Sequence, residues 1–122
     1  KEIALRLKPT YDLNALLNEV LKEMCKDEPG KIPSIIWTAK CYRSYFGMYH
    51  SEDNHIEINR LLNSPDVPKE VVKYIIYHEL LQRKFCKHDK IFRTQEHLYP
   101  NWTEHERFLD FTFPKFDLQN AY

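Results

Sequence analysis

The sequence predicts a single α+β domain in which one helix and a small sheet precede a group of helices. Three features indicate this class: an amphipathic pattern over residues 13–24, short β-branched and aromatic runs between positions 33 and 59, and helical patterns from residue 64 onward. Strands grouped before helices are typical of α+β folds rather than of doubly wound parallel sheets. The 122 residues suit one compact domain spanning 1–122, and not two.

The first helix is predicted from one apolar stripe. Its apolar side chains recur at the intervals that place them on a single helix face. Thr10 or Asp12 can cap the first turn, and Pro29-Gly30 ends the segment. We expect this face to cover the core. The stripe consists of Leu13, Leu16, Leu17, Val20, Leu21 and Met24.

The middle of the chain predicts a small sheet of about three strands. Residues 35–38 and 45–49 are rich in β-branched and aromatic side chains, and residues 55–59 alternate polar and apolar as a half-buried strand does. The polar cluster at residues 51–54 predicts a turn, so the last two strands should form a hairpin.

The second half of the chain predicts helices. Residues 64–68 contain two prolines near a helix start, and the apolar helix that follows should run to about Phe85. Asp89 can cap a further helix that ends before Pro100, and residues 103–110 should form a last short helix. The aromatic tail at residues 111–122 has no clear period.

Composition excludes several function classes. Lys plus Arg and Asp plus Glu number 18 each, which gives no electrostatic case for nucleic acid or an anionic membrane as main partner. No apolar run approaches the roughly 18 residues of a membrane span. Three scattered cysteines suit a reducing compartment, so we expect a cytoplasmic protein. Two glycines cannot form a Gly-rich phosphate loop.

The segment His78-Glu79-Leu80-Leu81-Gln82 carries the main chemical signal. It differs by one residue from H-E-x-x-H, in which two histidines four apart on a helix bind zinc and the glutamate acts on the metal-bound water. His78 and Gln82 should share one helix face, with Glu79 offset as a general base would be. Gln82 offers only an amide oxygen, a weaker zinc ligand than imidazole.

Two further residues are candidates for a third ligand. His88 follows Gln82 after a predicted turn, and Glu96 lies on the next predicted helix. A helical separation of eight residues is about 12 Å, so one of them would bind the ion and the other would support a ligand. His50 and His55 are spare imidazoles that could complete the site, whereas His97 and His105 are expected at the surface.

Four short segments together resemble one family. They are I-E-I-N at 56–59, Y-I-I-Y-H-E-L-L at 74–81, K-H-D-K-I-F at 87–92 and E-H-L-Y-P-N-W at 96–102. In order and spacing they resemble the small zincin metallopeptidases, which include SprT-like domains, YgjP-like domains and the minigluzincins. The resemblance covers about residues 33 to 110.

The resemblance implies zinc-dependent hydrolysis of peptide bonds in a cleft along the sheet's edge strand. It implies that His78 is the first zinc ligand, that Glu79 is the general base and that Gln82 occupies the second ligand position. The third ligand would be His88 in the SprT-like pattern or Glu96 in the gluzincin pattern, and the spacing favours His88. Peptide would add to residues 44–50, with Phe46 and Tyr49 near the cleft unless they pack the core.

Three functions follow from these observations. The chain is either a zinc metalloendopeptidase acting on peptide or protein, latent or disabled by Gln82, or an inactive zincin-fold module that binds peptide or self-associates. A role on DNA–protein crosslinks, by analogy with SprT-like proteases, is weakened by the zero net charge. The C-terminal tail should dock on the domain, either behind the helices or in the cleft, and could exchange between chains.

Overall fold

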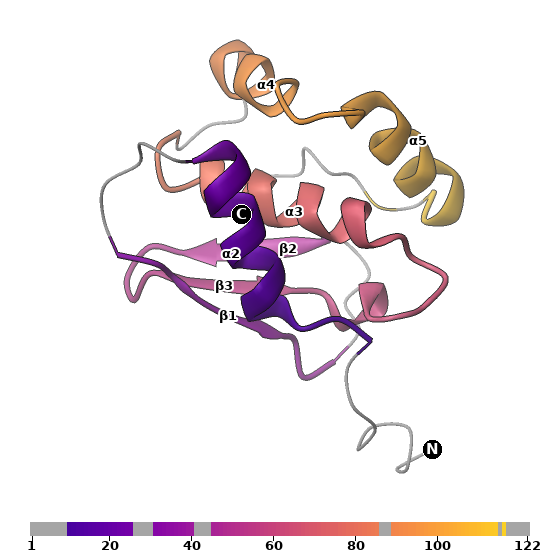
Figure 1. Ribbon diagram of the computed structural model, residues 1–122, viewed down its shortest axis with the longest axis horizontal. Coiled ribbons are helices and arrows are strands. Elements are labelled where there is room, and N and C mark those ends of the chain that lie inside the picture. Colours follow the sequence, from indigo (N-terminus) through magenta and orange to yellow (C-terminus); the bar gives the residue numbers. More distant parts are fainter. Residues whose placement is uncertain (1–9, 26–30, 41–44, 86–88, 115, 117–122) are drawn as a thin grey trace.

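The computed structural model describes residues 10–25, 31–40, 45–85, 89–114 and 116. These residues form an α+β fold in the predicted order, with a helix, a three-stranded sheet and then further helices (Figure 1). The elements are α2 (Leu13–Met24), β1 (Ser34–Trp37), β2 (Gly47–His50), β3 (His55–Ile58), the 3-10 turn η1 (Arg60–Leu62), α3 (Lys69–Leu81), α4 (Lys90–Glu96) and α5 (Trp102–Thr112).

The sheet has the order β1-β3-β2, so β1 and β2 are its edges. β1 runs parallel to β3, and β2 pairs with β3 as the predicted antiparallel hairpin. The turn of this hairpin contains Asn54 with a φ of 51°, a left-handed conformation that asparagine tolerates better than most residues.

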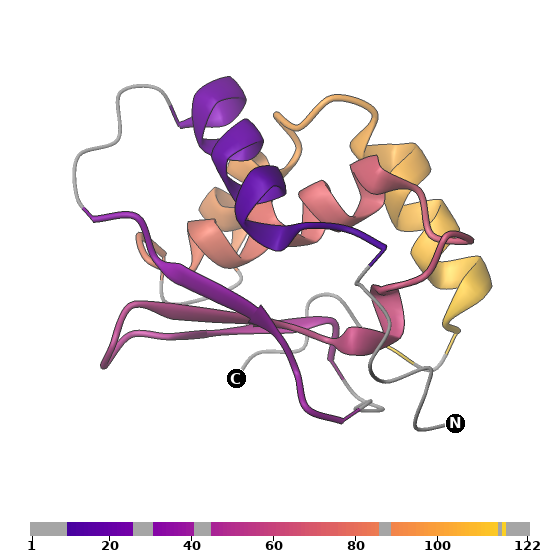
Figure 2. The same ribbon diagram turned by 60° about the horizontal axis from the view of Figure 1, so that its bottom comes forward.

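All described helices lie on one side of the sheet (Figure 2). Ile56 and Ile58 of β3 point towards the helices and are fully buried. Because side chains alternate along a strand, the residues between them point to the opposite face. On that outer face the paired strands place Ser34, Ile36, Met48, His50, His55 and Glu57.

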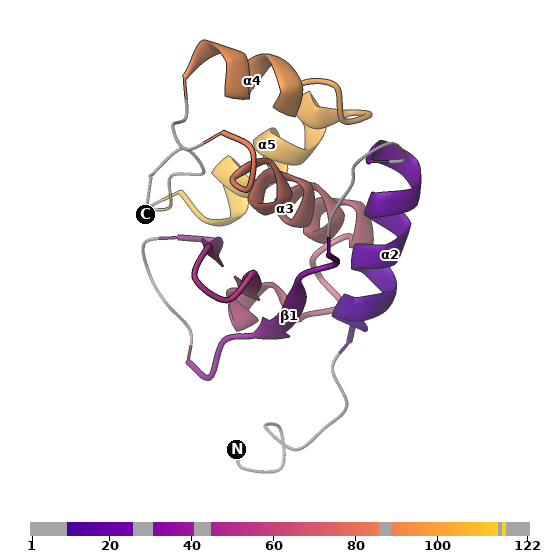
Figure 3. The same cartoon turned by 90° about the vertical axis from the view of Figure 1, so that its left-hand side faces the viewer.

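Helix α3 is the centre of the domain. Every residue from Val71 to Leu81 is buried, because α2, α4, α5 and the sheet surround this helix (Figure 3). The predicted extension to Phe85 is wrong. The helix ends at Leu81, and Gln82 and the two residues after it are held by i→i−3 hydrogen bonds of a tighter turn.

The predicted caps of two helices are confirmed. The carboxylate of Asp12 accepts from the amides of Asn14 and Ala15 at the start of α2, and that of Asp89 accepts from the amide of Phe92 in α4. Helix α5 is longer than predicted, since it begins at Trp102 and ends at Thr112. Among the described residues, no helix has the length and apolar character needed to cross a membrane.

A buried lysine links α2 to α3. The ammonium of Lys73 lies 3.0 Å from a carboxylate oxygen of Glu19, 3.0 Å from one of Glu23 and 3.6 Å from one of Glu70. Burial lowers the pKa of Lys73, but its hydrogen bonds to Glu19 and Glu23 outweigh that effect and raise the pKa. The charge is therefore retained inside the helix pair, where it joins α3 to the carboxylates of α2.

Candidate active site

His78 and Glu79 lie in the last turn of α3 and are almost inaccessible to solvent. The exposed fraction is 2% for His78 and 4% for Glu79. Ionisable side chains are rarely buried to this extent unless they are paired. Their partners therefore define the chemistry of the site.

The partner of His78 is Glu96 at the end of α4. Nδ1 of His78 is hydrogen-bonded to Oε2 of Glu96, and the ring of Phe92 meets the imidazole edge-on at 5.0 Å between centroids. Burial lowers the pKa of His78, but the Glu96 hydrogen bond and the nearby Glu79 carboxylate raise it by more. Two of the predicted site residues are thus brought together across 18 positions of sequence.

Arg93 and Glu106 hold Glu96 from the other side. The guanidinium of Arg93 binds Oε1 of Glu96 and also lies 3.1 Å from Oε2 of Glu106 on α5. The hydroxyl of Tyr74 donates to the same Glu106 carboxylate, and burial is the main reason that the pKa of Tyr74 is raised. The network joins α3, α4 and α5 at the base of the site.

Glu79 faces the edge strand β2. A Cβ atom on Gly47 would lie 3.1 Å from Oε2 of Glu79 and 3.1 Å from the carbonyl oxygen of Glu57. The absence of a side chain at Gly47 therefore makes room for the Glu79 carboxylate. Burial raises the pKa of Glu79 to about 7, although the neighbouring His78 acts in the opposite direction.

Gln82 caps the C-terminal end of α3, one turn beyond His78, and is half-buried. Gln82 itself keeps right-handed helical dihedral angles, with φ −62° and ψ −25°, so the helical offset of four residues from His78 is maintained. His88, the other candidate ligand, lies outside the described residues.

A group with metal-ligand spacing also includes Glu96. Ligand atoms of Glu96, His97 and Glu106 lie within 4.8 Å of one another. Arg93 supplies positive charge to both carboxylates, so they form ion pairs with its guanidinium. The ring of His97 stacks on Trp102 at 3.5 Å, and its buried Nε2 has no hydrogen-bond partner among the described residues.

The spare histidines do not join His78. His50 and His55 lie on the outer face of the sheet, where both face Glu57. The expectation that His97 and His105 are surface residues is wrong. His97 is half-buried and His105 is buried, because α5 packs these positions towards Trp102 and Tyr74.

The two predicted substrate-binding aromatics have different surroundings. Phe46 is buried, and its ring contacts Phe113 at 5.8 Å and Phe116 at 4.8 Å between centroids. Tyr49 is half-buried and donates its hydroxyl to Asn54 at 2.8 Å. The chain that follows α5 therefore returns to the edge of the sheet at the start of β2.

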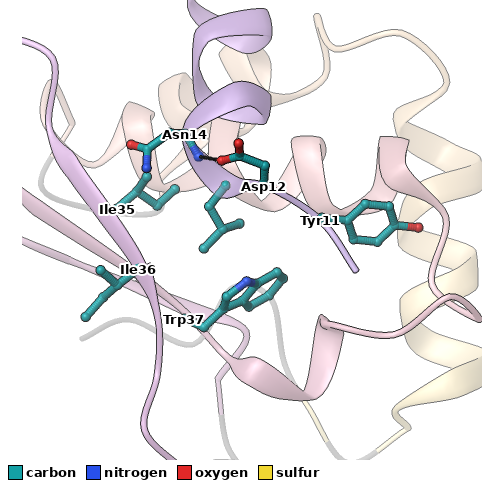
Figure 4. A pocket seen from close by; sticks show the side chains of 7 residues that line it. Tyr11, Asp12, Asn14, Ile35, Ile36 and Trp37 are labelled. Atoms are coloured by element: carbon teal, nitrogen blue, oxygen red, sulfur yellow. Dashed lines mark hydrogen bonds between the residues drawn. The ribbon is translucent and has the colours of Figure 1, made fainter. Parts of the chain in front are cut away.

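A groove of about 630 Å³ lies elsewhere, at the junction of α2 and β1 (Figure 4). Its lining is mainly apolar, with Ile35, Ile36 and Trp37 on the strand side. The carboxylate on its rim, Asp12, already caps α2. This groove brings together no set of groups suited to acid–base or metal chemistry.

Sequence reasoning missed the supporting residues. Arg93 lies three positions before Glu96 on a predicted helix, a spacing that could have identified it. Gly47 and Glu106 gave no local signal, because each acts on a residue in another element.

The donor set is compatible with a divalent metal. His78 is a buried imidazole whose Nδ1 is bound by a carboxylate, the arrangement that orients metal-binding histidines in proteins. The buried Glu79 carboxylate lies beside it, with space left by Gly47. Gln82 is the weak member, since an amide oxygen binds zinc less well than imidazole does.

Comparisons with solved structures identify proteins of similar fold. The fold is similar to the crystal structure of the metallopeptidase zymogen of Methanocaldococcus jannaschii jannalysin, with a TM-score of 0.63 and 20% identity, covering 84% of this chain and 97% of that one. It is also similar to the metallopeptidase zymogen of Pyrococcus abyssi abylysin, with a TM-score of 0.67 and 14% identity, covering 88% of this chain and all of that one. At these identities the likeness shows the fold alone.

Sequence comparison identifies the family. Curated proteins gave no significant match. Residues 10–111, which include α2, the sheet and the His78-Glu79 motif, match the family described as YgjP-like, metallopeptidase domain. The predicted resemblance to small zincins is therefore confirmed, and the chain belongs to the YgjP-like metallopeptidase domain family.

Proposed function

We propose that this chain is a zinc metalloendopeptidase domain whose catalytic site is disabled by Gln82 in its present form. The observation that supports this most directly is the buried contact of His78 with Glu96 beside the buried carboxylate of Glu79. Such an arrangement of burial and perturbed pKa is typical of a functional site rather than of ordinary packing.

In this proposal His78 and His88 hold the metal, and Glu96 supports His78. Nδ1 of His78 is bound to Glu96, and in this proposal Nε2 is the atom that would bind the metal. Glu96 is itself fixed by Arg93, as a carboxylate that orients a ligand should be. Gln82 takes the second ligand position with a weaker donor.

Glu79 is the proposed general base. When bound, zinc lowers the pKa of its water and polarises the scissile carbonyl group. Glu79 would accept the proton of the attacking water and deliver it to the leaving amine. In the metal-free chain burial raises the pKa of Glu79 to about 7, and a raised pKa of this kind is typical of carboxylates that act as general bases near neutral pH.

The proposed substrate is an extended peptide that adds to the edge of β2. Among the described strands β2 pairs with β3 alone, so its other edge is the proposed place for a peptide. Phe46 and Tyr49 lie on this strand or next to it. Phe113 and Phe116 cover Phe46, which supports a latent state in which the C-terminal segment restricts access.

The test is restoration of the missing imidazole by Gln82→His. We expect the restored chain to bind about one zinc ion per chain, more tightly than the parent chain does, and to cleave casein. The parent chain should not cleave casein. Glu79→Gln in the restored chain is the matched control, and it should keep zinc and lose cleavage. A restored chain that binds zinc at His78 and cleaves no peptide would contradict the proposal.

The alternative function is a zincin-fold module that binds peptide without cleaving it. The substitution at position 82 and the intact edge of β2 favour it. Peptide binding by both the parent and the restored chain, with cleavage by neither, would establish this alternative.

A further inference from the structure

The outer face of the sheet carries two histidines and a glutamate side by side. His50 and His55 are directly paired across β2 and β3, and Glu57 follows His55 two positions later on the same face. Cross-strand pairs place their Cβ atoms about 4.5–5.5 Å apart. We propose that His50, His55 and Glu57 form a second site, which binds a divalent transition ion of the zinc type.

The two imidazole–carboxylate distances suit this assignment. Nε2 of His50 lies 3.5 Å from Oε1 of Glu57, and Nε2 of His55 lies 3.7 Å from Oε2 of the same carboxylate. Two donors bound to one tetrahedral zinc ion are about 3.3 Å apart. The imidazole–carboxylate distances therefore need to shorten only slightly. The distance between the nitrogens of the two imidazoles must shorten the most.

The side chains have the freedom to close that gap. The two imidazole rings lie 5.7 Å apart between centroids and are nearly parallel, at 22°. The exposed fractions of the side chains are 33% for His50, 29% for Glu57 and 19% for His55. Rotation about the Cβ–Cγ bonds of these half-exposed residues can turn both nitrogens towards one ion that arrives from solvent.

Ser34 of β1 fixes the orientation of His55. Its hydroxyl oxygen lies 2.8 Å from Nδ1 of His55, and Ser34 pairs with His55 in the parallel register. When Nδ1–H donates to this hydroxyl, the lone pair of Nε2 faces Glu57. Metal-binding histidines are commonly held through their second nitrogen in this way.

The chemistry of the cluster selects the ion. Imidazole donors favour zinc, copper and nickel over calcium and magnesium, and one carboxylate provides a negative charge. Neither lysine nor arginine is among the described sheet residues on this face. A divalent ion would place positive charge next to the Glu57 carboxylate.

The experiment titrates Zn²⁺ into the full chain, stripped with chelator and prepared without a polyhistidine tag. Ring ¹H–¹⁵N signals of the individual histidines report each site separately. We expect saturable shifts of the His50 and His55 signals. Ser34→Ala should weaken this binding by about 10–100-fold, and Glu57→Gln should weaken it at least as much.

Met48→Ala is the matched control, because it changes the same face of β2 without removing a donor. It should leave the zinc response of His50 and His55 unchanged. Unperturbed His50 and His55 signals at saturating zinc, or equal affinity in the Glu57→Gln chain, would overturn the inference. The His78 signal reports the proposed catalytic site, so the failure of one site is distinguished from that of the other.

Discussion

At the scale of single residues, Gly47 is the position where the absence of a Cβ atom makes room for the Glu79 carboxylate. Its hydrogen occupies a place where a Cβ would lie 3.1 Å from Glu79 Oε2 and 3.1 Å from a backbone carbonyl of the neighbouring strand. Real Cβ contacts are almost always longer, so the neighbours would have to move. The edge strand and the proposed base are therefore fitted to each other.

We expect Gly47→Ala to destabilise the protein by about 1–3 kcal/mol, the usual cost of overpacking. The measurement is urea unfolding of the single variants and of the double variant with Glu79→Ala. Because the double variant removes one of the two clashing groups, Gly47→Ala should cost less in that background. Additive effects would show that Glu79 does not approach Gly47 closely.

The buried carboxylate of Glu79 should make stability depend on pH. Its pKa is raised from 4.5 to about 7, so the folded state binds a proton more tightly than the unfolded state does. Stability should therefore fall as the pH rises from about 4.5 through 7. In protein kept metal-free with a chelator, the free energy of unfolding of Glu79→Gln should rise by about 2–3 kcal/mol relative to that of the parent between pH 5 and pH 8.

Urea unfolding of both chains at several pH values measures this difference. The parent and the variant share every other titrating group, so the difference between them reports Glu79 together with its effect on the pKa of His78. Parallel pH profiles for the two chains would mean that the pKa of Glu79 is not raised in the folded state.

At the scale of elements, the contact between α2 and α3 depends on Lys73. Its side chain is 3% exposed, whereas the carboxylates around it are about half exposed, so the lysine is the buried member of the cluster. The lysine stem also packs between the helices. Removal of charge and removal of volume can therefore be tested separately.

We expect Lys73→Ala to cost about 2–4 kcal/mol, because it leaves a cavity, and Lys73→Met to cost about half as much. The hydrogen bond with Lys73 lowers the pKa of Glu19, so the ion pair stabilises the fold above about pH 4.5 and loses that effect as the pH falls below it. The deficit of Lys73→Met should accordingly shrink from pH 7 to pH 3, as measured by thermal unfolding. A loss of stability in Lys73→Met that does not change with pH would mean that Lys73 stabilises the fold by packing alone.

At the scale of the whole molecule, the described residues after α5 pack back on the edge of the sheet. The rings of Phe113 and Phe116 pack on Phe46, so residues that follow the last helix stabilise the beginning of the edge strand. Aromatic pairs of this kind contribute about 0.5–1.5 kcal/mol each beyond their burial. The same contacts would oppose a peptide that approaches β2.

In the Gln82→His chain we expect Phe113→Ala combined with Phe116→Ala to raise peptide cleavage by about tenfold, since about 1.4 kcal/mol of covering contact is removed. Phe111→Ala is the matched control, because Phe111 is 87% exposed in the same segment. Cleavage rates with a casein substrate provide the measurement. Equal rates in all three chains would show that the segment stabilises the fold without restricting the site.

The sequence by itself determined the elements of this protein. Apolar periodicity and the caps at Asp12 and Asp89 are local signals, and they placed α2 and α4 correctly. The alternation in β3 and the polar turn before it determined the hairpin. The His78-Glu79 motif with its flanking segments determined the family. Each of these depends on residues that are neighbours along the chain.

The tertiary structure alone decided which side chains meet. The contacts of His78 with Glu96, of Glu79 with the strand at Gly47, and of Arg93 with α5 join different elements. The burial of His105 and the early end of α3 depend on packing for the same reason. Local patterns specify the face of an element, but the partner on that face follows only when the elements pack together.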